Sequence, residues 1–170
     1  YLGPLLGTDR LAEDAPEAKE ALDRAQARLD KLMSIQGKHG AEYFHRQLGE
    51  ILYRDCGVAR NKEDLARGIE EIRELRKAFW SDLFIPGEPN EMNQQLEYAN
   101  RVADYIDLGE LMCVDALDRD ESCGAHYRDD HISEDGEAER DDANWCFVSA
   151  WERGNNGPAW DLSLIHISEP

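Results

Sequence analysis

Two stretches near the start of the chain place apolar residues at spacings of three and four, which puts them on one face of an α-helix. The first stretch follows a candidate N-cap at Asp14 and ends near Gly37. The second begins after Gly40 and ends at Gly57, a residue type suited to a left-handed C-terminal cap. The pattern therefore predicts two amphipathic helices.

Two further helices are predicted downstream. Asn61 and Asp64 resemble a capping box with Asp in place of Glu, and an apolar stripe follows them as far as Phe79. Residues 85–90 contain two prolines and a glycine, which predict a loop. A longer amphipathic stretch covers residues 93–117 and predicts the fourth helix.

The four helices predict an all-α fold. Helices with one apolar stripe bury it against each other, and short connections favour antiparallel neighbours. Residues 14–118 are therefore expected to form an up-and-down bundle of three to four helices, similar to a spectrin repeat.

The pattern changes after the fourth helix. Between residues 118 and 142 there are eleven acidic residues and three arginines, a local net charge of −8, and the helical periodicity is lost. This segment has few large apolar residues, so we expect an irregular surface segment that is poorly ordered by itself. Residues 145–151 are rich in aromatic residues and predict a short edge strand that needs a partner, closed by a turn at residues 154–158.

Composition narrows the range of functions. The 170 residues carry 19 basic and 37 acidic side chains, a net charge of −18 that repels phosphate backbones and makes nucleic-acid binding unlikely on electrostatic grounds. With 41% hydrophobic residues the chain can form one sizeable core. No apolar run is long enough to span a membrane, and the four cysteines form no C-x-x-C pair, so we expect reduced thiols.

Three groups of residues were considered for chemistry, and none forms a complete site. Cys123, His126, His131 and Cys146 are of zinc-ligand type, but their spacing matches no standard zinc pattern. Cys123 with His126 as its base would be a nucleophile pair, yet the surrounding acids raise the pKa of a thiol. Glu42 and His45 form half of a di-iron ligand set, and no second Glu-x-x-His exists in the sequence. The chain also lacks a G-x-G-x-x-G loop.

The candidate residues by themselves indicate no function, but longer stretches of the sequence resemble a known family. The stretch Ala116–Asp129, which reads A-L-D-R-D-E-S-C-G-A-H-Y-R-D, resembles the motif that closes the helical domain of succinate dehydrogenase and fumarate reductase flavoproteins. Residues 43–49, 56–61 and 101–112 are similar to the subgroup of the di-haem bacterial type, and residues 135–142 and 150–152 continue the match. Many family members have Arg where Cys123 stands.

The resemblance implies an enzyme whose active part lies outside this chain. Family members bind FAD on a flavin domain, interconvert succinate and fumarate by hydride transfer, and pass electrons through an iron–sulfur subunit to quinone. They attach indirectly to a membrane-anchor cytochrome b subunit at the cytoplasmic face of the bacterial inner membrane. The dicarboxylate and flavin sites match no residues here, so the resemblance implies no catalytic, cofactor-binding or metal residue in this fragment, which is expected to be structural, inactive and free of flavin.

The resemblance also implies a division of the chain. Residues 1–13 would end the flavin domain and form a linker, and residues 119–161 would form the acidic segment and a strand that pack on the flavin domain. Within that segment we expect Glu121, Ser122, His126 and Arg128 to make interdomain hydrogen bonds, although polar residues after a helix also serve as caps.

The end of the sequence departs from the family, which continues into a tail containing Lys and Arg. Residues 162–170 do not resemble that tail, and we expect them to be a non-native extension. Two alternatives for the whole chain stay open at this point: a free-standing helical interaction module, and the C-terminal domain of L-aspartate oxidase.

Overall fold

The structure is a computed structural model that describes residues 15–88, 91–153 and 160–165. These residues form five helices and four short strands. The helices are α2 (Pro16–Ser34), α3 (Ala41–Asp55), α4 (Lys62–Asp82), α5 (Gln94–Asp118) and the one-turn α6 (Asp142–Trp145). The strands are β1 (Ala59–Arg60), β2 (Tyr127–Arg128), β3 (Val148–Arg153) and β4 (Trp160–Ile165).

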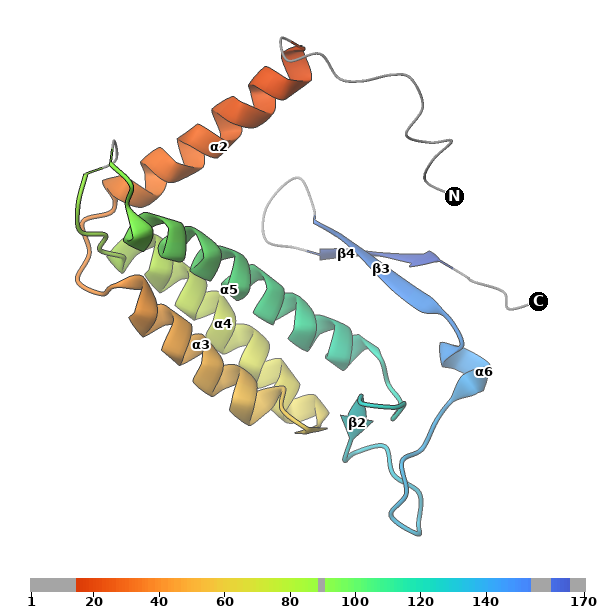
Figure 1. Ribbon diagram of the computed structural model, residues 1–170. Helices are drawn as coiled ribbons and strands as arrows, with labels where there is room; N and C mark the ends of the chain where they lie inside the picture. The colour runs from red at the N-terminus through yellow and green to blue at the C-terminus, as the bar shows by residue number, and fades with distance from the viewer. Residues whose placement is uncertain (1–14, 89–90, 154–159, 166–170) are drawn as a thin grey trace.

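Helices α3, α4 and α5 lie side by side and alternate in direction, as the apolar stripes predict (Figure 1). Their buried side chains form one hydrophobic core, in which Phe44 of α3 meets Phe79 of α4 edge to face at 5.3 Å between ring centroids. Leu65, Ile72, Val102 and Ile106 are fully or almost fully buried in the same core. The predicted up-and-down helical fold is confirmed as a bundle of three helices.

The predicted helix ends are partly confirmed. The side-chain oxygen of Asn61 accepts a hydrogen bond from the backbone N–H of Asp64 at 2.8 Å, as expected for an N-cap. The prediction of a left-handed cap at Gly57 is wrong, because the described glycines with positive φ are Gly87, Gly124 and Gly136. Glycine is needed at 57 for another reason: a Cβ there would lie 2.6 Å from the carbonyl oxygen of Tyr53.

Helix α2 leaves the bundle at an angle, and its free end points away from α5 (Figure 1). Its N-cap is Ala15, while Asp14 lies outside the described residues. Only the C-terminal part packs on the bundle, where Leu32 is fully buried and Arg28 pairs with Asp104 of α5 at 2.5 Å. Leu22, on the predicted apolar stripe, is 68% exposed. The expectation that every stripe is buried against the other helices is therefore wrong for α2.

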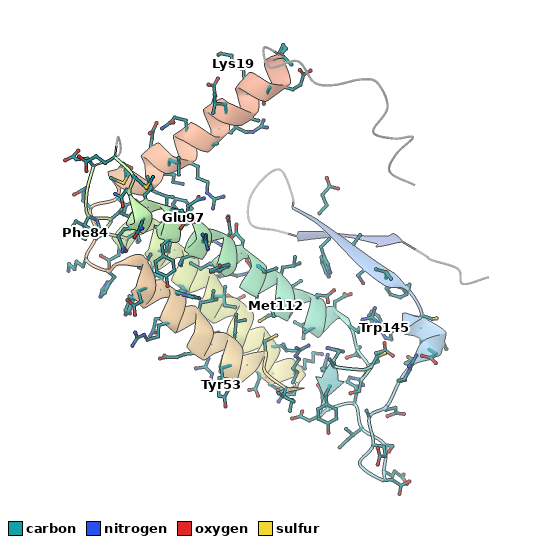
Figure 2. The ribbon with its side chains drawn as sticks, in the orientation of Figure 1. Lys19, Tyr53, Phe84, Glu97, Met112 and Trp145 are labelled. Carbon is teal, nitrogen blue, oxygen red and sulfur yellow. The ribbon has the colours of Figure 1, made fainter. Side chains whose placement is uncertain are left out.

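Buried charges join α4 to α5. Glu110 of α5 is fully buried, and its carboxylate binds Arg73 at 2.7 Å and Arg76 at 2.5 Å, both from α4. Arg76 also binds Asp107 at 2.9 Å. A buried carboxylate is tolerated only when it is paired, so these contacts fix the facing sides of the two helices. Unlike these buried side chains, the side chain of Tyr53 projects outward from α3 (Figure 2).

The linker between α2 and α3 lies against the C-terminus of α4. The backbone N–H groups of Lys38 and His39 donate to the carbonyl oxygen of Asp82 at 3.0 and 3.1 Å, and His39 Nδ1 lies 2.6 Å from Asp82 Oδ2. A Cβ at Gly37 would overlap the Asp82 backbone. The two segments can approach this closely only because residue 37 has no side chain.

The last strands form an antiparallel hairpin, in which Val148 pairs with Ile165 and Arg153 pairs with Trp160. The strand begins later than predicted, since residues 142–145 form α6 and β3 begins at Val148. The predicted turn at residues 154–158 and the extension at 166–170 lie outside the described residues. Residues 160–165 supply the partner that the predicted edge strand requires. That residues 162–170 are a non-native extension stays a prediction.

Replacing Gly37 by Ala is expected to destabilise the protein by more than about 2 kcal/mol, because the new methyl group cannot fit without moving backbone. Gly49 of α3 is the matched control: a Cβ there meets no atom within 4 Å, and Gly49→Ala is expected to add roughly 0.5–1 kcal/mol through helix propensity. Urea unfolding of both variants measures the two effects. Equal stability of the two variants would contradict the tight crossing at Gly37.

Candidate functional site

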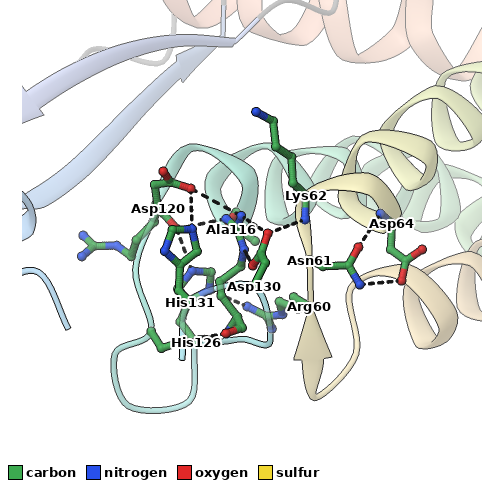
Figure 3. Close-up of polar contacts among 12 residues, drawn as sticks. Arg60, Asn61, Lys62, Asp64, Ala116, Asp120, His126, Asp130 and His131 are labelled. Atoms are coloured by element: carbon green, nitrogen blue, oxygen red, sulfur yellow. Dashed lines mark hydrogen bonds and ion pairs between the residues drawn. The ribbon is translucent and has the colours of Figure 1, made fainter. Parts of the chain in front are cut away.

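The four residues predicted to form an interdomain contact follow the C-terminus of α5 in the chain. Figure 3 shows one of them, His126, together with Asp130 and with Arg60 and Lys62 at the start of α4. The chain reaches α4 through β1 and later returns as β2, and the two strands pair in parallel, with Ala59 opposite Tyr127 and Arg60 opposite Arg128. This pairing brings a segment from after α5 next to one from before α4. The sequence did not indicate the pairing, since each strand has only two residues.

Arg128 is at the centre of this cluster, and its side chain is 1% exposed. Its guanidinium binds both carboxylate oxygens of Asp130 at 2.7 Å. It also donates to the carbonyl oxygens of Ala116 and Arg119 at 3.2 and 3.3 Å, at the end of α5. A cation beneath a helix C-terminus satisfies carbonyl groups that have no partner within the helix, and it also interacts favourably with the helix dipole.

Asp130 links this cluster to α4. Its carboxylate accepts a hydrogen bond from the backbone N–H of Lys62, the first residue of α4, at 3.0 Å. The hydrogen bonds from Arg128 are the main cause that lowers the pKa of Asp130 to about 2, against the opposing effect of burial. The carboxylate is thus held ionised between a buried guanidinium and a helix N-terminus.

Ser122 and Glu121 close the cluster on the other side. The Ser122 hydroxyl accepts from the Arg128 backbone N–H at 2.8 Å and lies 3.0 Å from the Arg128 carbonyl oxygen, to which it donates. Glu121 accepts from Arg119 at 2.7 Å and from the backbone N–H of Asp141 at 2.9 Å. Both residues are buried, so this surface segment is not exposed throughout.

His126 has both ring nitrogens engaged. Its Nε2 lies 2.9 Å from the carbonyl oxygen of Arg119, and its Nδ1 lies 3.1 Å from a guanidinium nitrogen of Arg60. Because a carbonyl only accepts and a guanidinium only donates, the neutral ring with its proton on Nε2 satisfies both contacts. Burial is the main cause that lowers the pKa of His126, and the nearby arginines lower it further, led by Arg60.

Arg119 connects the cluster to the end of the chain. Its guanidinium donates to the carbonyl oxygens of Trp145 and Phe147 at 3.2 and 3.0 Å and lies over both rings. In β3, Trp151 donates its indole N–H to Asp115 of α5 at 2.7 Å. The hairpin is therefore attached to α5 through polar contacts at two places.

The structure thus brings together all four predicted residues, Glu121, Ser122, His126 and Arg128. The hydrogen bonds described above join them to other groups of this chain. The sequence analysis missed Arg60, Arg119 and Asp130, which complete the cluster. The spacing of Arg128 and Asp130 was an available signal, but the same spacing occurs in the exposed pair Arg140 and Asp142. Periodicity cannot distinguish the buried pair from the exposed one.

A tight hairpin carries the exposed tip of the cluster. The backbones of Cys123 and His126 exchange hydrogen bonds at 2.8 and 3.0 Å, and Gly124 has φ of 60° between them. Gly124 and Ala125 are exposed. The buried residues hold this tip in one conformation while leaving it open to solvent.

The other candidates do not assemble a reaction centre. His126 is engaged by Arg119 and Arg60, so it is not free to act as a base for Cys123. His131 binds Asp120 at 2.8 Å, and His45 binds the Tyr98 hydroxyl at 2.7 Å. In the parts of the chain that the structure describes, no group of three or more His, Cys, Asp or Glu side chains could hold a metal ion. Nor does any helix in those parts have the length and apolar character needed to cross a membrane.

One hollow of about 480 Å³ lies between α3 and α4. Four glutamates line it, and each has a partner. Glu50 accepts a hydrogen bond from Gln47 at 3.3 Å, and the other three form ion pairs: Glu70 with Arg73, Glu71 with Arg54, and Glu74 with Lys77. The lining offers no free carboxylate pair for acid–base chemistry.

Comparison with known proteins shows to which family the chain belongs. A family model described as fumarate reductase flavoprotein C-term matches residues 45–169, most of the chain. The chain belongs to this family. It is the C-terminal domain of a fumarate reductase or succinate dehydrogenase flavoprotein subunit, as the resemblance of its sequence implied.

Members of the fumarate reductase flavoprotein family share both sequence and fold with the chain. It is 33% identical to the fumarate reductase flavoprotein subunit of Proteus vulgaris over 94% of its length and 27% of the relative's. It is 28% identical to the succinate dehydrogenase flavoprotein subunit of Bacillus subtilis over 67% of its length and 18% of the relative's. The chain thus spans about a quarter of the length of the fumarate reductase relative.

Solved structures of family members agree with this fold. A mutant of E. coli quinol fumarate reductase FrdA superposes with a TM-score of 0.77 at 25% identity, and the match covers 97% of this chain and 28% of that one. A chain of quinol-fumarate reductase with menaquinol molecules gives 0.79, also at 25% identity, over 97% and 27% of the two chains. The bundle and the segment after it therefore correspond to one domain of a longer flavoprotein.

Replacing Arg128 by Lys is expected to lower the free energy of unfolding by about 2 kcal/mol or more, because a single ammonium cannot reproduce the fork to Asp130 and the two carbonyl contacts. Arg140 is the matched control, with the same spacing to Asp142 and a side chain that is 59% exposed. We expect Arg140→Lys to leave stability unchanged. Denaturant unfolding measures both variants, and similar losses in the two would contradict the central role of Arg128.

The lowered pKa of His126 gives a pH dependence of known sign. Protonation is harder in the folded protein than in the unfolded one, so the contribution of His126 to stability is complete above about pH 6.5 and is lost as the pH falls below it. The slope cannot exceed about 1.4 kcal/mol per pH unit for one proton. Urea unfolding between pH 7.5 and 5.5 measures it, and the decline should be shallower in His126→Gln. An identical decline in the variant would assign the effect to other groups.

Proposed function

We propose that the chain is the C-terminal part of a flavoprotein subunit that interconverts succinate and fumarate. In this proposal FAD and the dicarboxylate bind in the part of the subunit that precedes this domain, and hydride passes between substrate and flavin there. The observation that carries the proposal is the family match over residues 45–169, together with the similarity to FrdA over 97% of the chain. The domain itself has a supporting role and binds no flavin.

The partners follow from the same assignment. The subunit would pass electrons to an iron–sulfur subunit and reach a membrane-anchor cytochrome b subunit indirectly, which would place it at the cytoplasmic face of the bacterial inner membrane. A relative among the solved structures is described as quinol-fumarate reductase with menaquinol molecules, which supports a quinone as the final partner. The high negative charge of the chain makes nucleic acid an unsuitable partner.

The domain is proposed to brace the flavin domain through the cluster at the end of α5. Glu121, Ser122 and Arg128 are buried and bonded within this chain, so their part is to hold the segment in shape. The exposed tip at Gly124 and Ala125 is then the surface that meets the flavin domain, with His126 directly behind it. In this proposal the exposed tip makes the interdomain contact, and Glu121, Ser122, His126 and Arg128, which were expected to make it directly, hold the tip in place.

The proposed function is tested in a chimera, in which this chain replaces the matching C-terminal region of the Proteus vulgaris subunit. We expect the chimera to retain flavin and to reduce fumarate with a chemical electron donor, whereas the 170-residue chain purified by itself should be colourless. A chimera that folds but lacks both flavin and activity would contradict the assignment. So would a stoichiometric flavin spectrum in the isolated chain.

The bracing surface is tested in the same chimera with Ala125→Arg, which places a bulky charge on the exposed tip, and with Ala125→Ser as the matched control. We expect Ala125→Arg to release flavin more readily and to lower the thermal midpoint of the chimera, while the isolated chain with the same substitution unfolds as before. Equal flavin retention in the two chimeras would place the contact elsewhere.

A further inference from the structure

Helix α2 has an apolar face that is covered only near the C-terminus of the helix. There Leu32 is fully buried and Leu29 is half-buried. Ala25 and Leu22 precede these two residues by seven positions each, close to two helical turns, so they lie on the same face. Leu22 is nevertheless 68% exposed, and Ala25 is exposed as well. The first turns of α2 thus present this apolar face to solvent.

The polar side of α2 is stabilised within the helix itself. It carries three side-chain pairs four residues apart, which are Lys19 with Asp23, Glu20 with Arg24, and Gln26 with Asp30. Such exposed pairs contribute little to stability. A helical stretch of about a dozen residues is marginal in water unless its apolar face packs against something. The uncovered face of α2 is therefore expected to pack against a surface outside this chain.

Helix α5 presents one of its sides between α2 and the hairpin. Asp104 on this side pairs with Arg28 of α2. Asp115 accepts the indole N–H of Trp151 in β3. The two aspartates are eleven residues apart, close to three helical turns, so they lie on the same side of α5. Leu108 lies between them and is 52% exposed. Helix α2 and the hairpin thus both project from this side of α5 (Figure 1). We call the surface formed by Leu22, Ala25, Leu108 and Trp151 the open face.

A second hollow of about 480 Å³ lies at the hairpin end of the open face. It is lined by Lys62, Val114, Leu117, Asp118, Asp120 and Trp151. Asp118 has no ion-pair partner among the described residues, and it ends α5, where the helix dipole disfavours a negative charge. Burial is the main cause that raises the pKa of Asp118, and the charge of Asp115 raises it further. Because Asp120 already binds His131, the carboxylate of Asp118 is the one left to receive a basic group.

The length of the relatives indicates what covers the open face. The chain matches the C-terminal part of the family and spans 27% of the Proteus vulgaris subunit. The rest of such a subunit precedes α2 in the polypeptide and, in the proposed function, contains the flavin site. A domain joined covalently to the start of α2 has a high effective concentration at the face beside it. This advantage favours the flavin domain over a separate protein.

We propose that the open face receives the flavin domain of the same subunit, which packs an apolar surface against Leu22 and Leu108 and inserts a basic side chain into the hollow beside Asp118. The inference rests on the proposed function and adds a second contact to the one at the hairpin tip of Gly124 and Ala125. The apolar contact removes exposed side chains of α2 and α5 from water. The basic side chain neutralises a carboxylate that its own helix disfavours.

The apolar contact is tested in the chimera that carries this chain in the Proteus vulgaris subunit. We expect the amides of residues 16–27 to exchange hydrogen roughly tenfold more slowly, or slower still, in the chimera than in the isolated chain, because a covered helix opens less often. Leu22→Glu should remove most of this protection and lower the thermal midpoint of the chimera, while the isolated chain unfolds as before. Tyr53→Glu is the matched control, since Tyr53 is 87% exposed in α3 and lies outside the open face; it should change neither measurement.

The basic contact is tested by Asp118→Asn, for which opposite effects are expected in the two proteins. In the isolated chain the substitution removes a half-buried charge from a helix C-terminus and should raise the thermal midpoint. In the chimera it removes an ion pair and should lower the midpoint. A rise in both proteins would overturn the basic contact.

The outcomes separate this inference from the proposed function. Suppose that the parent chimera holds flavin and reduces fumarate. The inference is then overturned if residues 16–27 exchange as fast as in the isolated chain, or if Leu22→Glu and Tyr53→Glu give the same thermal midpoint, and the proposed function stands. A parent chimera that folds without flavin and activity would overturn the proposed function, and this inference with it.

Discussion

The part of the molecule beyond α5 depends on one buried guanidinium. Arg128 carries a positive charge into a place where it has almost no contact with water, and this is tolerable only because Asp130 and the carbonyl groups at the end of α5 surround it. The segment around it has a net charge of −8, and the repulsion between its carboxylates opposes a compact conformation. Arg128 pairs with some of these carboxylates and so reduces the repulsion. Strand β2 and the hydrogen bonds of the Ser122 hydroxyl then fix the backbone of the segment around it.

The same principle, a buried charge held by partners from another element, appears twice within the bundle. Glu110 of α5 is held by Arg73 and Arg76 of α4, and Asp55 of α3 is held by Arg54 and by Arg67 of α4. Apolar stripes can slide along one another at small cost, whereas a buried ion pair has one acceptable register. These pairs therefore fix the relative positions of the three helices and, through α5, the position of the Arg128 cluster.

This arrangement suits the supporting role proposed for the domain in a flavoprotein subunit. The bundle provides a rigid base, the Arg128 cluster shapes the segment after it, and an exposed hairpin tip lies at its edge. The role proposed for the tip requires a defined shape more than any reactive group.

The sequence by itself determined the helices, because apolar spacing and caps such as Asn61 are local properties that survive in any context. It also determined the family, because long stretches such as residues 116–129 resemble one family in order. It did not determine that Glu110 is buried, that α2 leaves the bundle, or that residues 160–165 pair with β3. Nor did it show that Arg128 is buried and Arg140 is exposed, although each has an aspartate two residues on. Those outcomes depend on contacts between segments far apart in the chain, and only the tertiary structure decides which charges find a partner and which stay in water.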